Sequence, residues 1–150
     1  MKNGDVSVHS GVHKAVQKAV KRARLSEIQA IAIYESEVFW IRKPDRRALL
    51  AKILEEERSH NDELRPYGEI SSIETRLSQT AGWILGTVLS SLPWSVLCKV
   101  QSWAEGEAAA IYDKAAVEIK MNGALNPEVI QKLEHARDQE LEHARLFRVL

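Results

Sequence analysis

Two stretches decide the fold: residues 27–34 read EIQAIAIY, and residues 105–112 read EGEAAAIY. Both have a glutamate, five further residues and then Ile-Tyr. Each stretch is followed along the chain by a Glu-x-x-His motif, ERSH at residues 57–60 and ELEH at residues 140–143. With the Glu-to-Ile-Tyr stretch called A and the Glu-x-x-His motif called B, the order along the chain is A, B, A, B. This order predicts two helix pairs related by a pseudo-twofold axis.

The segments that carry these motifs have the periodicity of helices. Apolar residues recur at three- and four-residue spacing, and no segment predicts a strand. Lys43-Pro44-Asp45 separates the first two helices, with Asp45 expected as N-cap, and Asn122-Gly123 is expected to stop the third. Asn126 is the expected N-cap of the fourth, with Pro127 in its first turn. The predicted helices cover about residues 10–42, 46–64, 94–121 and 127–150.

The bulk composition narrows the class of protein. A chain of 150 residues fits one domain, predicted over residues 1–150 with residues 1–10 flexible. Lys+Arg and Asp+Glu both total 21, so the net charge gives no reason to expect nucleic-acid binding. The one cysteine, Cys98, allows no intramolecular disulfide or Cys-based zinc site and suggests a reducing compartment. The N-terminus is not read as a secretory signal, because no apolar segment follows it.

Residues 77–98, between the second and third long helices, carry no charge. That length could span a bilayer, but two glycines and Pro93 interrupt it. The expected structure is a short helix, a break near residues 91–93 and the start of the third helix, forming an additional apolar hairpin. A spanning segment would place Glu57 and Glu105 on opposite sides of the membrane. A segment lying on the membrane surface is therefore favoured.

The motif pairs predict a metal site. Glutamate and histidine three residues apart lie on one helix face and can hold the same ion. One such motif often lies on a solvated surface, but here each follows a helix in which a glutamate, Glu27 or Glu105, stands in a largely apolar stretch. Four helices carrying two such glutamates and two Glu-x-x-His motifs provide the ligand set of ferritin-like di-iron proteins. The predicted metal ligands are Glu27, Glu57, His60, Glu105, Glu140 and His143.

The ligand types favour particular ions. Carboxylates with two imidazoles and no thiolate suit iron or manganese better than calcium or structural zinc. Two iron ions are the expected cofactors, with Glu57 and Glu140 as bridges and Glu27 and Glu105 as terminal ligands.

Several further residues lie near the predicted ligands. Tyr34 and Tyr112 each follow a ligand glutamate by seven residues and should face the same side. They either pack in the core with a hydroxyl partner, or hydrogen-bond the ligands or take part in redox chemistry. The histidines also need partners that orient them, and the sequence does not choose among the residues beside the motifs. These candidates are Glu56, Arg137, Asp138 and Glu142.

A group of basic residues opens the first predicted helix. It is either a solvated helix face or a patch for an anionic membrane surface or a partner protein. Its members are Lys14, Lys18, Lys21, Arg22 and Arg24.

The chain resembles the demethoxyubiquinone hydroxylase family over roughly residues 15–150. The resemblance rests on Glu27 with Ile33-Tyr34, on residues 57–60, on Glu105 with Tyr112, and on residues 138–143. It implies a di-iron mono-oxygenase of ubiquinone biosynthesis that hydroxylates a methoxy-benzoquinone whose isoprenoid tail stays in the membrane. It further implies a peripheral protein on the cytoplasmic side of a bacterial inner membrane or its organelle equivalent. O2, a quinone-like lipid and the membrane surface would be its partners, with a homo-oligomer or an accessory lipid-binding protein as further possibilities.

Other functions stay open on sequence grounds. The chain departs from the family's usual residues at two places, which leaves room for another substrate. These are Arg24-Leu25-Ser26 just before Glu27 and Ala110-Ile111 just before Tyr112. A soluble ferritin-like ferroxidase, or a rubrerythrin-like protein that handles peroxide or iron, is the main alternative. The absence of cysteine pairs argues against a complete rubrerythrin. The third alternative is a plain helical bundle whose motifs decorate its surface.

Overall fold

The computed structural model describes residues 5–121 and 126–150, with side chains given for residue 14 and from residue 16 onward. The described residues contain helices and no strand, so the predicted all-α class is confirmed. The described residues leave out residues 1–4, which are part of the segment expected to be flexible. They also leave out the expected helix stop at Asn122-Gly123. The elements are α1 (Asp5–Trp40), α2 (Pro44–Leu64), the 3-10 turn η1 (Arg65–Tyr67), α3 (Ser72–Ser90), α4 (Trp94–Met121) and α5 (Pro127–Val149).

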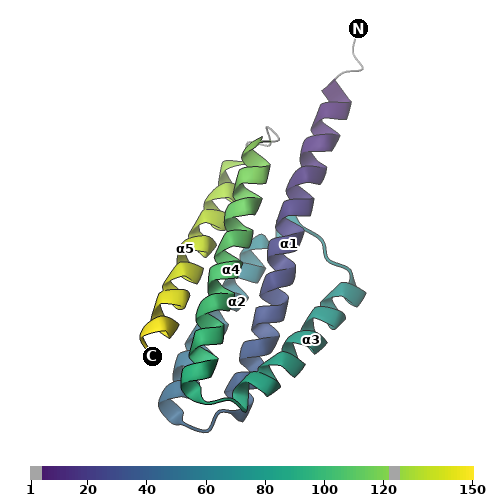
Figure 1. Cartoon of the computed structure of the whole chain (residues 1–150). Coiled ribbons are helices and arrows are strands. Elements are labelled where there is room, and N and C mark those ends of the chain that lie inside the picture. The colour runs from purple at the N-terminus through teal and green to yellow at the C-terminus, as the bar shows by residue number, and fades with distance from the viewer. Residues whose placement is uncertain (1–4, 122–125) are drawn as a thin grey trace.

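Four of the helices form a ferritin-like bundle, as predicted. Helices α1, α2, α4 and α5 run side by side, and α3 lies along the outside of α1 (Figure 1). Helix α1 packs on both α2 and α4, and α5 packs on both α4 and α2, which closes the ring. The two pairs α1–α2 and α4–α5 are the two A–B units of the sequence.

The starts of two helices test the predicted caps. Asn126 caps α5 as predicted: its side chain accepts a hydrogen bond from the backbone N–H of Val129 at 3.3 Å. The predicted cap of α2 is wrong. Lys43 is the N-cap, with an extended backbone at φ −70° and ψ 121°, and Pro44 is the first helical residue. Proline fits that position because its fixed φ suits a helix and its missing N–H has no intrahelical role there. Asp45 lies in the first turn instead.

The uncharged segment has the predicted break. Helix α3 ends at Ser90, and α4 begins at Trp94. Helix α3 starts with a capping box, in which the Ser71 hydroxyl accepts from the Glu74 N–H and the Glu74 carboxylate accepts from the Ser71 N–H. Among the helices of the described residues, none combines the length and the hydropathy needed to cross a bilayer.

Two glycines allow α3 to approach α1 closely. A Cβ at Gly82 would lie 2.5 Å from the carbonyl oxygen of Gln29 and 2.9 Å from the Cβ of Ala32. A Cβ at Gly86 would lie 2.9 Å from the Cβ of Ser36. The glycines expected to interrupt the segment therefore serve to pack its helix, since any larger residue would push α3 away from α1.

Two apolar clusters form the core, one toward each end of the bundle. The first joins the early part of α1 to the later part of α4 and the start of α5, and includes Val20, Leu64, Tyr112, Ile119 and Leu133. The second joins the start of α2 to the end of α5, and includes Tyr34, Leu50, Ile53, Leu54 and Phe147.

Candidate metal centre

All six predicted ligands lie together in the bundle interior. Helix α1 supplies one glutamate and α4 another, while α2 and α5 each supply a Glu-x-x-His pair. The motifs therefore do not decorate the surface, and the plain-bundle alternative is wrong on this point. The exposed fractions are 1% for Glu27, 1% for Glu57, 3% for His60, 4% for Glu105, 0% for Glu140 and 5% for His143.

The ligand atoms form two overlapping groups, within each of which they lie no more than 4.8 Å apart. One group contains Glu27 and His60, and the other contains Glu105 and His143. Glu57 and Glu140 belong to both groups. This is the arrangement expected of two neighbouring ions that share two bridging carboxylates.

Several buried polar atoms of this cluster have no hydrogen-bond partner among the described residues. Leaving such atoms unsatisfied costs on the order of 1–3 kcal/mol each, and more for charged groups. A bound cation would satisfy them, and two divalent ions would balance the four carboxylates. The donor set therefore fits a pair of iron ions. The unpartnered atoms are Glu27 Oε2, Glu57 Oε1, both carboxylate oxygens of Glu140, His60 Nδ1 and His143 Nδ1.

The carboxylates repel one another where no cation lies between them. Burial raises the pKa of Glu57 well above its ordinary value, and the charges of Glu27 and Glu140 raise it further. Burial also raises the pKa of Glu105. Burial opposes ionisation of Glu140 too, but the nearby His143 and His60 lower its pKa to about 2. The cluster thus holds protons that metal ions would displace.

Each histidine turns one nitrogen inward and the other outward. His60 Nδ1 lies 3.2 Å from Glu140 Oε1, and His143 Nδ1 lies 3.4 Å from Glu57 Oε1. The outward Nε2 of His60 lies 2.8 Å from Gln139 Oε1, and that of His143 lies 2.6 Å from Glu56 Oε2. These outer contacts fix the rings so that Nδ1 faces the metal positions.

Of the four candidate orienting residues, only Glu56 contacts the outward nitrogen of a histidine. Glu56 contacts His143, whereas Arg137 and Asp138 form an exposed ion pair with each other and Glu142 is exposed. Gln139 was missed, although a signal existed: it directly precedes Glu140, just as Glu56 directly precedes Glu57.

The tyrosines cross between the two halves of the centre. The Tyr34 hydroxyl donates to Glu105 and the Tyr112 hydroxyl donates to Glu27, so each tyrosine on one ligand helix holds the glutamate of the other. Burial raises the pKa of both phenols well above the ordinary value, which keeps them protonated as donors. Both tyrosines therefore pack in the core with a hydroxyl partner, and that partner is a predicted ligand.

The comparison with known families agrees with this geometry. A family model described as "Ubiquinone biosynthesis protein COQ7" matches residues 14–147. The chain belongs to this family. Membership confirms the resemblance to the demethoxyubiquinone hydroxylases and gives the protein a role in ubiquinone biosynthesis. No curated protein and no solved structure matches the chain.

This COQ7-family chain also has a buried polar pair beside Tyr34 that the sequence reading missed. Gln101 Nε2 donates to Glu37 Oε1 at 2.8 Å, and both side chains are buried. Burial raises the pKa of Glu37 to about 8, although the Gln101 hydrogen bond lowers it somewhat. Their spacing was a usable signal, because Glu37 is three residues after Tyr34 and Gln101 is four residues before Glu105.

A groove between α1, α3 and α4 leads to this side of the centre. The groove has a volume of about 310 Å³. Its polar end contains Tyr34, Gln101 and the predicted ligand Glu105. Its other walls are largely apolar and include Ile33, Leu85, Trp103, Ala108 and Ile111.

Proposed function

We propose that this COQ7-family chain is a di-iron, O2-dependent mono-oxygenase that hydroxylates a membrane-held, quinone-like substrate in ubiquinone biosynthesis. The observation that carries the proposal is the buried cluster of four glutamates and two histidines with unpartnered donor atoms. The overall reaction converts a ring C–H, O2, two electrons and two protons into a ring C–OH and water. The enzyme therefore also needs an external two-electron reductant.

Each proposed ligand has a distinct place in this scheme. Glu27 and His60 would hold one ion, Glu105 and His143 the other, and the two remaining glutamates would bridge them. When bound, two iron(II) ions supply two electrons for the reduction of O2. The protein's own groups keep the ligands in place: the tyrosine hydroxyls hold the terminal glutamates, and the outer contacts orient the imidazole rings.

The groove between α1, α3 and α4 supports an apolar, ring-shaped substrate. Its walls are mainly aliphatic, while its polar end presents Tyr34 and Gln101 beside Glu105. Pockets of this kind hold an apolar body and fix its orientation with a few polar groups. A quinone ring entering here would have its carbonyl oxygens near the buried polar groups and its edge toward the centre.

Apolar side chains on and beside α3 support a peripheral position on the membrane. Large apolar side chains are exposed along this helix, on α4 next to it and at the end of α1. Phe39 and Trp83 contact each other across α1 and α3, with ring centroids 6.1 Å apart. Such a surface suits the interface of a bilayer, on the cytoplasmic side, from which an isoprenoid tail could reach the groove. The exposed residues are Phe39, Trp40, Ile73, Leu77, Trp83, Ile84, Leu85, Val88 and Trp103.

Oxygen labelling tests the proposed reaction. The iron-loaded protein in vesicles is given a methoxy-benzoquinone with an isoprenoid tail, a reductant and ¹⁸O2. We expect one labelled oxygen in the hydroxylated product, detected by mass spectrometry. An Ala108→Phe variant, which fills the groove, should keep its iron and lose product formation. Ala110→Phe is the matched control, because Ala110 is exposed on the same helix and does not line the groove.

The alternatives predict different outcomes. A ferritin-like ferroxidase would oxidise many equivalents of iron(II) per chain, form no labelled quinone and be unaffected by Ala108→Phe. A rubrerythrin-like protein would consume peroxide, form no labelled quinone and likewise be unaffected by Ala108→Phe. Flotation with vesicles adds an independent check, since a protein found wholly in the soluble fraction would contradict a membrane-held substrate.

A further inference from the structure

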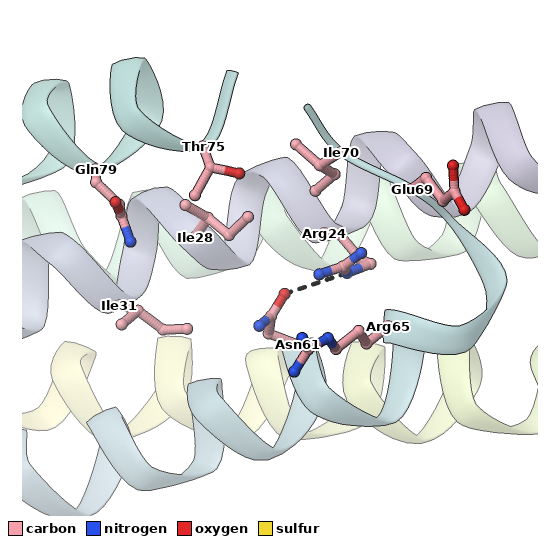
Figure 2. Close-up of a pocket in the computed structure, with 9 residues that line it drawn as sticks. All are labelled: Arg24, Ile28, Ile31, Asn61, Arg65, Glu69, Ile70, Thr75 and Gln79. Atoms are coloured by element: carbon pink, nitrogen blue, oxygen red, sulfur yellow. Dashed lines mark hydrogen bonds between the residues drawn. The ribbon is translucent and has the colours of Figure 1, made fainter. Parts of the chain in front are cut away.

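A second, larger cavity lies on the other side of α1, between α1, the end of α2, the turn η1 and the start of α3. Its volume is about 670 Å³. Polar and charged side chains from these elements line it, together with isoleucines from α1 and from the connection before α3 (Figure 2). None of its lining residues is a predicted metal ligand. The lining consists of Arg24, Ile28, Ile31, Asn61, Arg65, Glu69, Ile70, Thr75 and Gln79.

Arg24 is a buried cation without a carboxylate partner. It is 8% exposed, so its assignment to a solvated basic face or patch is wrong. Its Nε donates to Asn61 Oδ1 at 3.2 Å, and its Nη1 donates to the carbonyl oxygen of Gly68. Among the described residues, Nη2 has no acceptor and no acidic group forms an ion pair with Arg24. The guanidinium lines the cavity, so an anion there would meet a cation that no ion pair compensates.

A second arginine adds to the uncompensated positive charge. Arg65 lines the same cavity, and its side chain has no ion pair among the described residues. Burial lowers the pKa of Arg24, and the nearby charge of Arg65 lowers it further, while Asp62 partly offsets this. The two guanidinium groups repel each other across the cavity. An anion bound between them would be attracted to both and would offset their repulsion.

The remaining lining groups complete an anion site. Asn61 Oδ1 already accepts from Arg24, which leaves its amide N–H groups as donors. The Thr75 hydroxyl donates to the carbonyl oxygen of Ser71 at 3.0 Å, so Gln79 adds the further donors from α3. Glu69 is the one acidic residue of the lining, and Figure 2 shows its carboxylate directed away from both guanidinium groups. The lining thus has one more positive than negative charge.

We propose that this cavity binds a phosphate group carried by an organic ligand, with Arg24 and Arg65 as its charged contacts. The fork of an arginine side chain matches phosphate oxygens in pairs. The volume is far larger than a lone small anion fills, and Ile28, Ile31 and Ile70 offer an apolar wall to the organic part. The phosphate can belong to a phospholipid headgroup or to a soluble phosphate ester. This site is separate from the proposed hydroxylation and does not depend on it.

Binding of two probes to the iron-loaded full chain tests the site. Glycerol 3-phosphate is titrated by calorimetry, and vesicles of phosphatidylcholine with and without phosphatidic acid are tested by flotation. We expect one of the probes to bind and Arg65→Gln to weaken that binding about tenfold or more, as loss of a charge-assisted contact predicts. Arg76→Gln, which removes an exposed charge of α3 outside the cavity, should leave the binding unchanged.

The variants separate the outcomes. Loss of glycerol 3-phosphate binding in Arg65→Gln assigns the site to soluble esters, and loss limited to vesicles with phosphatidic acid assigns it to lipid headgroups. Arg24→Gln should have the same effect, but this residue also holds the Gly68 carbonyl and its loss can impair folding. Arg65 is exposed, so its variant keeps the test valid. Binding of neither probe, or equal binding by Arg65→Gln and Arg76→Gln, overturns the proposal.

Discussion

The two halves of the candidate metal centre have matching ligands but different surroundings. Each half combines a terminal glutamate, a histidine and a tyrosine that reaches across from the other half. The outer partner of His60 is the neutral amide of Gln139, whereas that of His143 is the carboxylate of Glu56. A carboxylate makes the imidazole a stronger donor to a metal than an amide does. The two metal positions are therefore chemically unequal.

The residues that surround Tyr34 and Tyr112 differ as well. Glu37 lies ten residues after Glu27, and Gln101 lies four residues before Glu105. The corresponding positions of the other half are Ala115 and Ala23, both buried in the apolar cluster. The polar half is also the one that the groove reaches. The repeated motifs thus bring the predicted ligands together, and the residues that break the repeat distinguish a polar side, which this groove reaches, from an apolar side.

The largest expected effect separates shared from unshared ligands. Glu57→Ala or Glu140→Ala removes a donor from both groups, so iron should fall from about two to well under one ion per chain. Glu27→Ala or Glu105→Ala removes a donor from one group and should leave about one ion. Iron analysis of the purified variants checks this.

Glu142→Ala is the matched control for the ligand variants, because Glu142 is exposed on the same helix as Glu140. It should bind as much iron as the unaltered chain. Equal iron loss in Glu57→Ala and Glu27→Ala would contradict the division into two overlapping halves.

The next effect comes from the buried acid of the polar half. The folded chain keeps the Glu37 proton up to a pKa of about 8, while the unfolded chain releases it near the ordinary value of 4.5. The free energy of unfolding should therefore fall as pH rises between these values. At roughly 1.4 kcal/mol per pKa unit, the loss is on the order of a few kcal/mol. Glu37→Gln should be similar to the unaltered chain near pH 5 and more stable near pH 8.

Urea unfolding at several pH values measures this difference. Glu142→Gln is the control, since this exposed carboxylate should give the same pH profile as the unaltered chain. A Glu37→Gln profile parallel to that of the unaltered chain would show that Glu37 is ionised in the folded protein.

A smaller effect should follow from making the outer histidine partners alike. Glu56→Gln gives both histidines an amide partner and should weaken metal binding on the His143 side about tenfold, or roughly 1.4 kcal/mol. Gln139→Glu gives both a carboxylate and should strengthen binding on the His60 side. Titration with iron(II) against a competing chelator measures both changes. Shifts of the same sign in the two variants would contradict the inequality of the halves.

The helices, and the residues that lie together in the candidate metal centre, could be predicted well because the motifs and helix ends depend on local spacing. The Glu-x-x-His motifs and the proline and asparagine at helix ends act within one or two turns. Residues whose role depends on packing between elements were harder to predict. Arg24 resembles its basic neighbours in the sequence, and only the return of the chain at Gly68 makes it a buried residue. Gln139 has charged neighbours on both sides, and only the position of α2 selects it.

The smallest expected effect concerns two equivalent ion pairs, one beside each half of the candidate metal centre. Glu35 and Asp113 directly follow the two tyrosines, and they pair with Arg58 at 2.9 Å and Arg137 at 3.2 Å. Because these pairs are exposed, Arg58→Met or Arg137→Met should each cost less than about 1 kcal/mol in the free energy of unfolding. Urea unfolding at low and high salt measures this cost, and salt should reduce it. Iron content should not change, since neither arginine contacts a proposed ligand; a fall in iron in one variant alone would mean that the surface, too, distinguishes the halves.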